Sequence, residues 1–129
     1  MTKDEVDRWL DAYVSAWKSY DTAEIGALFA DEVSYRYHPY DPPVEGRDAV
    51  VESWLGEGDH EGASTRDEPG TYDATYRTVA VDGDVAVATG SSTYTGDPPR
   101  VFHNCFVMRF DADGRCREFT EWYVQKSAS

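Results

Sequence analysis

A glutamate near the end of the chain, Glu121, is the residue whose surroundings most favour acid–base chemistry. Residues 101–125 have the pattern of a β-hairpin whose turn, Asp111–Gly114, suits a type I turn closed by a left-handed glycine. If Phe110 pairs with Arg115, then Glu121 lies opposite Asn104. Because side chains alternate along each strand, Glu121 and Asn104 share a face with Phe102, Phe106, Met108, Phe119 and Tyr123. Burying a carboxylate among apolar side chains is costly, and it raises the pKa toward the range of a general acid or base.

Two further residues have side chains suited to proton transfer. Histidine is the side chain whose ordinary pKa lies nearest neutral pH, and His38 ends a predicted strand over 33–38, since Pro39 cannot continue a strand ladder. Tyr13 lies on the apolar stripe of a predicted helix, where its hydroxyl could donate a hydrogen bond to a developing oxyanion. Each candidate has a structural alternative: Glu121 as a sheet-fixing acceptor, His38 bonded to a backbone carbonyl, and Tyr13 packed in the core.

Length and charge exclude several classes of protein. The chain has 129 residues, the size of one domain, which we expect to span 1–129. Its 25 Asp and Glu outnumber its 12 Lys and Arg, giving a formal net charge of −13. This field repels phosphates, so neither nucleic acid nor membrane is expected as a partner. The sequence contains no signal-peptide core and no run of membrane-spanning length, which favours a cytoplasmic protein.

The sequence predicts no metal and no cofactor. The histidines stand far apart without ligand spacing, at His38, His60 and His103. Gly83 joins two predicted strands, whereas a phosphate-binding loop leads from a strand into a helix. Cys105 and Cys116 fall out of register in the hairpin, which favours free thiols and a reducing compartment.

Periodicity gives the order of the elements that must position these residues. Thr2 and Glu5 form a capping box before a long amphipathic helix, and Asp21 opens a short helix that runs to Phe29. The remaining elements are a strand over 33–38, a helix over 47–55, a loop over 56–70 that we expect to be mobile, and hairpins over 72–94 and 101–125. This order indicates an α+β fold, with three N-terminal helices packed on a strongly curved antiparallel sheet.

Three motifs follow one another along this order: Tyr20-Asp21 running to Leu28-Phe29-Ala30-Asp31, Gly46-Arg-Asp-Ala-Val50 with Trp54, and Phe110-Asp-Ala-Asp-Gly114 followed by Glu118-Phe119-Thr-Glu-Trp122. In order and spacing they resemble the nuclear transport factor 2-like superfamily, in particular its SnoaL-like members, over essentially the whole chain. The resemblance implies a cystatin-like cone. It leaves function open, because that fold is shared by ketosteroid isomerase, dehydratases, polyketide cyclases, epoxide hydrolases and members without catalysis.

Ketosteroid isomerase has three catalytic positions that can be compared with this chain. Its oxyanion-binding tyrosine matches Tyr13, and its aspartate base matches His38 after a one-residue insertion. Its protonated aspartate matches Phe106, so the second oxyanion donor is lost. The resemblance therefore implies a reaction other than steroid isomerisation. It is still compatible with proton transfer in the same cavity.

We predict a cavity between the helices and the inner sheet face, with His38 or Glu121 as the base and Tyr13 as a hydrogen-bond donor. The expected ligand-binding residues are Trp17, Tyr37, Trp54, Phe102, Asn104, Phe106, Phe119 and Tyr123. An aromatic wall with few polar groups suits a small apolar molecule that contains a ring. We expect a cofactor-independent isomerase, cyclase, dehydratase or hydrolase, and the alternative is a ligand-binding or dimerisation module without catalysis.

The opposite face of the last hairpin is also apolar, with Val101, His103, Cys105, Val107, Trp122 and Val124. Helices can cover only one face of the sheet, and an uncovered apolar face indicates a partner. The resemblance implies that this partner is a second copy of the chain, packed sheet against sheet.

Overall fold

The structure is a computed structural model that describes residues 1–56 and 67–127. The described residues form, in chain order, α1 (Lys3–Ser19), α2 (Thr22–Ala27), β1 (Phe29–Arg36), β2 (Val44–Glu45), α3 (Arg47–Trp54), β3 (Tyr72–Asp82), β4 (Val85–Tyr94), β5 (Arg100–Phe110) and β6 (Cys116–Gln125). Most of the loop predicted to be mobile lies outside the described residues, as does His60.

Local hydrogen bonds determine where the first two helices begin. Thr2 Oγ1 accepts from the backbone N–H of Glu5 at 3.2 Å, and Glu5 Oε1 accepts from the N–H of Thr2 at 3.1 Å. Asp21 caps α2, since its Oδ1 accepts from the N–H of Glu24 at 3.0 Å. The predicted capping box and the second helix start are both confirmed.

Strand β1 begins earlier than predicted, because a tertiary contact ends the helix before it. We predicted that the second helix runs to Phe29, but α2 ends at Ala27 and Phe29 is already in β1. The carbonyl of Leu28 accepts from the N–H of Cys116 in β6 at 2.9 Å. This bond joins the chain to the last strand at the point where the helical pattern would continue.

The strands form one sheet of six, in the order β2-β1-β6-β5-β4-β3. β1 runs parallel to β6 and every other pair is antiparallel. The sheet is therefore mixed, whereas the sequence predicted an antiparallel sheet. The connection from β1 to β6 includes α3 and the other four strands, which is long enough to bring the chain back in the same direction.

The register of the last hairpin differs from the prediction by two residues. Glu121 pairs with Phe106 and not with Asn104. The turn is longer than predicted, with Phe110 opposite Cys116, and a bulge beside that pair adds one more residue. Because side chains alternate with a period of two, a shift of two leaves each residue on its predicted face.

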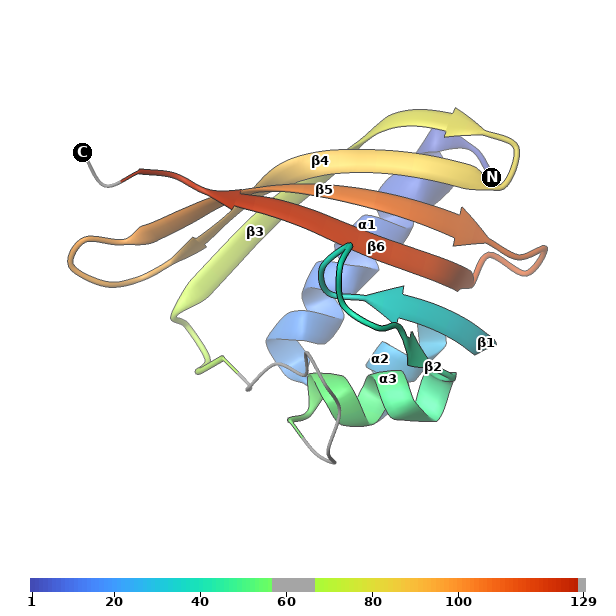
Figure 1. Ribbon diagram of the computed structural model, residues 1–129, viewed down its shortest axis with the longest axis horizontal. Helices are drawn as coiled ribbons and strands as arrows, with labels where there is room; N and C mark the ends of the chain where they lie inside the picture. Colours follow the sequence, from blue (N-terminus) through green and yellow to red (C-terminus); the bar gives the residue numbers. More distant parts are fainter. Residues whose placement is uncertain (57–66, 128–129) are drawn as a thin grey trace.

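All described helices lie on one side of the curled, open sheet, and β4, β5 and β6 curve over α1 (Figure 1). The core fills the space between α1 and this inner face, where Trp9, Phe106 and Phe119 are buried. None of the described helices covers the outer face, on which Val107, Trp122 and Val124 are 37%, 43% and 72% exposed. The predicted α+β cone is confirmed.

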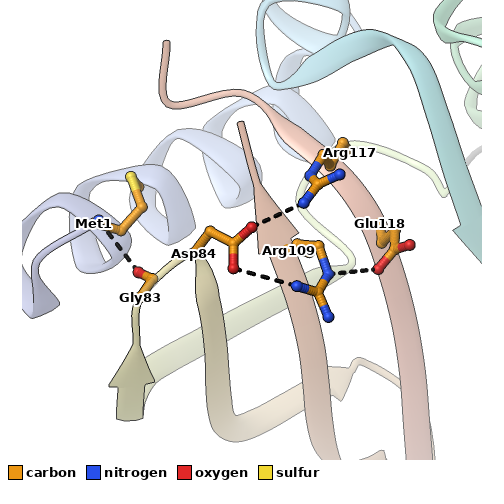
Figure 2. Close-up of polar contacts among 6 residues, drawn as sticks. All are labelled: Met1, Gly83, Asp84, Arg109, Arg117 and Glu118. Atoms are coloured by element: carbon orange, nitrogen blue, oxygen red, sulfur yellow. Dashed lines mark hydrogen bonds and ion pairs between the residues drawn. The ribbon is translucent and has the colours of Figure 1, made fainter. Parts of the chain in front are cut away.

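Ion pairs join the strands at the end of the sheet where the hairpin turns lie (Figure 2). Asp84, in the turn before β4, accepts from Arg109 of β5 at 3.2 Å and from Arg117 of β6 at 2.8 Å. Arg109 also donates to Glu118 at 3.0 Å. These side chains are partly exposed, and ion pairs in contact with water contribute little to stability. We therefore expect these ion pairs to align the strands more than to stabilise the fold.

Candidate active site

A cavity of about 130 Å³ lies between the end of α1 and the inner face of the sheet. Its lining is formed by α1, β1, α3, β3, β4, β5 and β6, together with one residue that follows α1, one that follows β1 and one that precedes β3. The lining residues are Tyr13, Trp17, Tyr20, Tyr35, Tyr37, Trp54, Asp67, Tyr76, Ser92, Tyr94, Asn104 and Glu121. A wider hollow of about 620 Å³, here called the vestibule, shares six of these residues: Tyr37, Asp67, Ser92, Tyr94, Asn104 and Glu121.

Glu121 lines both the cavity and the vestibule. Asn104 Nδ2 donates to Glu121 Oε2 at 2.6 Å, and Ser92 Oγ donates to Asn104 Oδ1 at 3.0 Å. This chain crosses three adjacent strands and sets the orientation of the carboxylate, since Asn104 is a diagonal neighbour of Glu121. Burial raises the pKa of Glu121 from 4.5 to about 7, although the hydrogen bond from Asn104 acts in the opposite direction.

Three tyrosines surround this carboxylate, Tyr13 on α1, Tyr35 on β1 and Tyr76 on β3. Burial is the main cause that raises the pKa of each phenol, and the charge of Glu121 raises all three further. The phenols therefore stay protonated at neutral pH and can donate hydrogen bonds to a ligand oxygen. Tyr13 is held by its ring neighbours, stacked on Phe119 at 5.7 Å between ring centroids and edge-on to Trp54 at 5.1 Å.

Gly90 on β4 gives Tyr76 the space to reach the cavity. The two residues are direct cross-strand partners. A Cβ atom added at Gly90 would lie 2.8 Å from Tyr76 Cα and 2.7 Å from its ring atom Cδ1, and it would also overlap the carbonyl oxygen of Thr75. Glycine is therefore the residue that this close approach allows.

Two more polar groups lie in the wall next to α3. Tyr37 and Ser53 share a hydrogen bond of 2.7 Å between their hydroxyl oxygens. The indole Nε1 of Trp54 is buried without a hydrogen-bond partner among the described residues. An unpaired buried donor is rare in folded proteins, and in a cavity wall it can bind an acceptor on a ligand.

His38 lies outside the cavity, in the lining of the vestibule. Its Nδ1 accepts from the backbone N–H of Tyr40 at 3.4 Å, and its ring centroid is 5.9 Å from that of Tyr123. The half-buried His38 lies two residues beyond β1, which ends at Arg36, so the prediction that His38 ends the strand is wrong. It lines the same vestibule as Glu121 but not the inner cavity.

The structure brings most of the predicted site residues together, in two groups. Tyr13, Trp17, Tyr37, Trp54, Asn104 and Glu121 line the cavity, whereas His38, Phe102 and Tyr123 line only the vestibule. Phe106 and Phe119 are not in either lining. They are 0% and 1% exposed and pack against Tyr13, so they support the cavity from the core.

Sequence reasoning missed six lining residues: Tyr20, Tyr35, Asp67, Tyr76, Ser92 and Tyr94. Alternation could have found Tyr35, because it shares a strand face with Tyr37. It could also have found Tyr76, Ser92 and Tyr94, which share the inner face of the first hairpin. Nothing in the sequence marks Asp67, which lies in the predicted loop over 56–70.

Among residues 1–56 and 67–127, no three His, Cys, Asp or Glu side chains are grouped as a metal ion would require. Both cysteines are free thiols, and burial raises the pKa of Cys116. None of the helices within residues 1–56 and 67–127 is long and apolar enough to cross a membrane.

Comparison with known proteins gives the family of this chain. Residues 10–119 match the SnoaL-like domain, so the chain belongs to the family of SnoaL-like domains. No curated protein matches the chain.

Solved structures show the same fold at low sequence identity. One is a nuclear transport factor 2-like (NTF-2 like) protein of unknown function from Burkholderia xenovorans LB400, with a TM-score of 0.69, 17% identity, and coverage of 98% of this chain and 88% of that chain. Another is an LEH-like epoxide hydrolase of M. tuberculosis, with a TM-score of 0.65, 16% identity, and coverage of 95% of this chain and 84% of that chain. At this low sequence identity the similarity shows the fold alone, and the reaction has to be inferred from the residues of the site.

Proposed function

We propose that this protein is a cofactor-independent proton-transfer enzyme in which Glu121 is the base. The proposal rests on the position of the Glu121 carboxylate, which lines both the cavity and the vestibule. Among the described residues, only Asn104 donates a hydrogen bond to this carboxylate. With a pKa of about 7, the carboxylate is ionised in about half of the molecules at neutral pH, so it can both take up and return a proton.

Tyr13 is the proposed hydrogen-bond donor to the oxygen on which negative charge develops. Its phenol lines the same cavity as Glu121, and its raised pKa keeps the proton on the phenol at neutral pH. A donor that is held by packing before the substrate arrives needs no reorganisation during the reaction. Tyr35 and Tyr76 can act with Tyr13, because both phenols line the cavity.

The dimensions of the site support a small substrate that contains a ring. The cavity of about 130 Å³ accepts one ring or a comparable group, and the vestibule accepts the rest of the molecule. Isomerisation, cyclisation, dehydration and hydrolysis all share the proposed step, in which a base removes a proton from carbon or from water. His38 is the less favoured base, since it lines the vestibule only.

A nitrobenzisoxazole tests the proposal directly, because its ring opening needs only a base. The carboxylate takes the C–H proton while the ring N–O bond breaks, which yields a nitrile and a coloured phenolate. We expect the wild type to catalyse this elimination and Glu121→Gln to lower the rate by roughly a hundredfold or more. Glu32→Gln, which removes an exposed carboxylate of β1, should leave the rate unchanged.

Equal rates in wild type and Glu121→Gln would overturn the assignment of the base. A protein that gains thermal stability with small aromatic ligands but catalyses no elimination would instead be a binding module.

A further inference from the structure

One wall of the cavity combines aromatic rings with a carboxylate. Trp17, Tyr20 and Tyr94 line the cavity beside Asp67. The ring centroid of Trp17 is 6.1 Å from that of Tyr94 and 4.5 Å from that of Tyr72, which lies behind it. This group brings together the end of α1, the start of β3 and the end of β4.

Asp67 is held in this wall by two ring systems. Its Oδ2 accepts from Trp17 Nε1 at 3.0 Å and from the Tyr20 hydroxyl at 3.4 Å, and its backbone N–H donates to that hydroxyl at 2.9 Å. The described residues give its Oδ1 no hydrogen bond and the carboxylate no ion pair. Asp67 is thus an oriented anion without a counter-cation in the described part of the chain.

The composition of the cavity favours a cation over an anion. Its described lining has eight aromatic side chains and two carboxylates, and contains no Lys, Arg or His. The faces of Trp and Tyr rings attract ammonium groups, and the net charge of −13 raises the local concentration of cations. Tyr94 already shows this affinity, since the guanidinium carbon of Arg100 lies 4.7 Å from its ring centroid.

We propose that the molecule bound in this cavity carries an ammonium group, which the Asp67 carboxylate holds against the rings of Trp17, Tyr20 and Tyr94. The rest of the molecule then lies toward Glu121, which lines the same cavity. The inference deepens the proposed function, because it names the substrate class of the same site. It assigns binding to one carboxylate and proton transfer to the other.

Arg100 is a cationic side chain near the site that could instead bind an anionic substrate. It is exposed and lines the vestibule but not the cavity, and the vestibule also contains Asp41, Asp67 and Glu121. One guanidinium and the imidazole of His38 therefore share the vestibule with three carboxyl groups, which leaves a cation as the favoured ligand.

Choline and its neutral carbon isostere, in which carbon replaces the ammonium nitrogen, form a matched pair of probes for calorimetric titration. We expect choline to bind at least about tenfold more tightly than the isostere. Asp67→Asn should lower the affinity for choline about tenfold, because it removes the negative charge. The affinity for the isostere should stay the same, because the amide oxygen of asparagine can still accept from Trp17 and Tyr20. Tyr94→Leu should weaken choline more than Tyr94→Phe, which keeps the ring.

Glu32→Gln is the control for net charge, since it removes one exposed carboxylate outside the cavity. Equal affinity for the two probes overturns the inference, as does an equal loss of choline affinity in Glu32→Gln and Asp67→Asn. Tighter binding of benzoate than of choline would assign the site to anions.

The elimination assay keeps this test separate from the proposed function, because nitrobenzisoxazole carries no ammonium group. Elimination without a preference for choline would retain the base and overturn the ammonium site. A preference for choline without elimination would retain the site and overturn the catalysis.

Discussion

Glu121 is a carboxylate whose ionisation the folded structure opposes. Burial on the inner sheet face raises its pKa to about 7, and the nearest hydrogen-bond donor, Asn104, only partly offsets that cost. The surrounding phenols of Tyr13, Tyr35 and Tyr76 titrate far above neutrality, so among these four groups Glu121 is the one expected to change charge near pH 7. The same property that suits a base must therefore lower stability as the pH rises.

Glu121→Gln should remove a pH dependence of the free energy of unfolding. Between about pH 5 and about pH 7 the folded protein keeps a proton on Glu121 that the unfolded chain releases, so wild-type stability falls as the pH rises. The pKa difference corresponds to at most about 3 kcal/mol. We expect the variant to be the more stable protein at about pH 8, with a flatter profile in urea denaturation across this range. Parallel profiles for the two proteins would show that Glu121 is not buried in this way.

His38→Ala should separate the two candidate bases. Because His38 lines only the vestibule, we expect elimination in the variant to stay within about a factor of three of the wild type, with little loss of stability. A rate as low as that of Glu121→Gln would move the base to His38, provided that circular dichroism shows a folded variant.

At the scale of the element, the cavity depends on how closely β3 and β4 approach each other. Gly90 has no side chain on the inner face, and the ring of Tyr76 occupies the space that a Cβ atom would need. A larger residue at position 90 would push Tyr76 toward the cavity or force the strands apart.

Gly90→Ala is therefore expected to destabilise the fold by about 1–3 kcal/mol, the usual cost of overpacking, and to weaken ligand binding. The matched control is Gly26→Ala in α2, where an added Cβ would meet side-chain atoms no closer than 3.8 Å. The control should be neutral or more stable by up to about 1 kcal/mol, since alanine favours helix. Denaturant midpoints measure both effects, and equal midpoints would contradict the account of Gly90.

At the scale of the whole molecule, the outer sheet face remains without a cover among the described residues (Figure 1). Val107, Trp122 and Val124 are exposed there on neighbouring strands. We propose that two copies of the chain pack through this face. Burial of apolar area, at about 25 cal/mol per Å², favours association, while the net charge opposes it and is screened beyond roughly 8 Å at physiological salt.

Trp122→Glu should convert the proposed dimer into monomers, because it places a charge in the centre of the contact. Light scattering after size-exclusion chromatography measures the mass, which should fall from twice the chain mass to the chain mass of 14.5 kDa. Tyr40→Glu adds the same charge at a residue that is 91% exposed outside the sheet and should remain a dimer. A wild-type monomer, or a Trp122→Glu dimer, would rule out this face.

The sequence by itself determined the features that depend on residues close together in the chain. The Thr2–Glu5 capping box starts α1, and Gly114 closes the last turn with a φ of 83°. Alternation placed Glu121 and Asn104 on the inner face although the predicted register was two residues off, because faces repeat with that period. These features arise from hydrogen bonds and pleating within single elements.

Only the tertiary structure decided strand direction, depth and the contacts between distant segments. No pattern in β1 shows that it runs parallel to β6, because direction depends on the path of the whole connection. Alternation cannot tell Phe106 and Phe119, which are buried in the core against Tyr13, from Tyr35 and Tyr76, which line the cavity. Asp67 belongs to the site because Trp17 and Tyr20 lie beside it in space, 50 and 47 positions away in the chain.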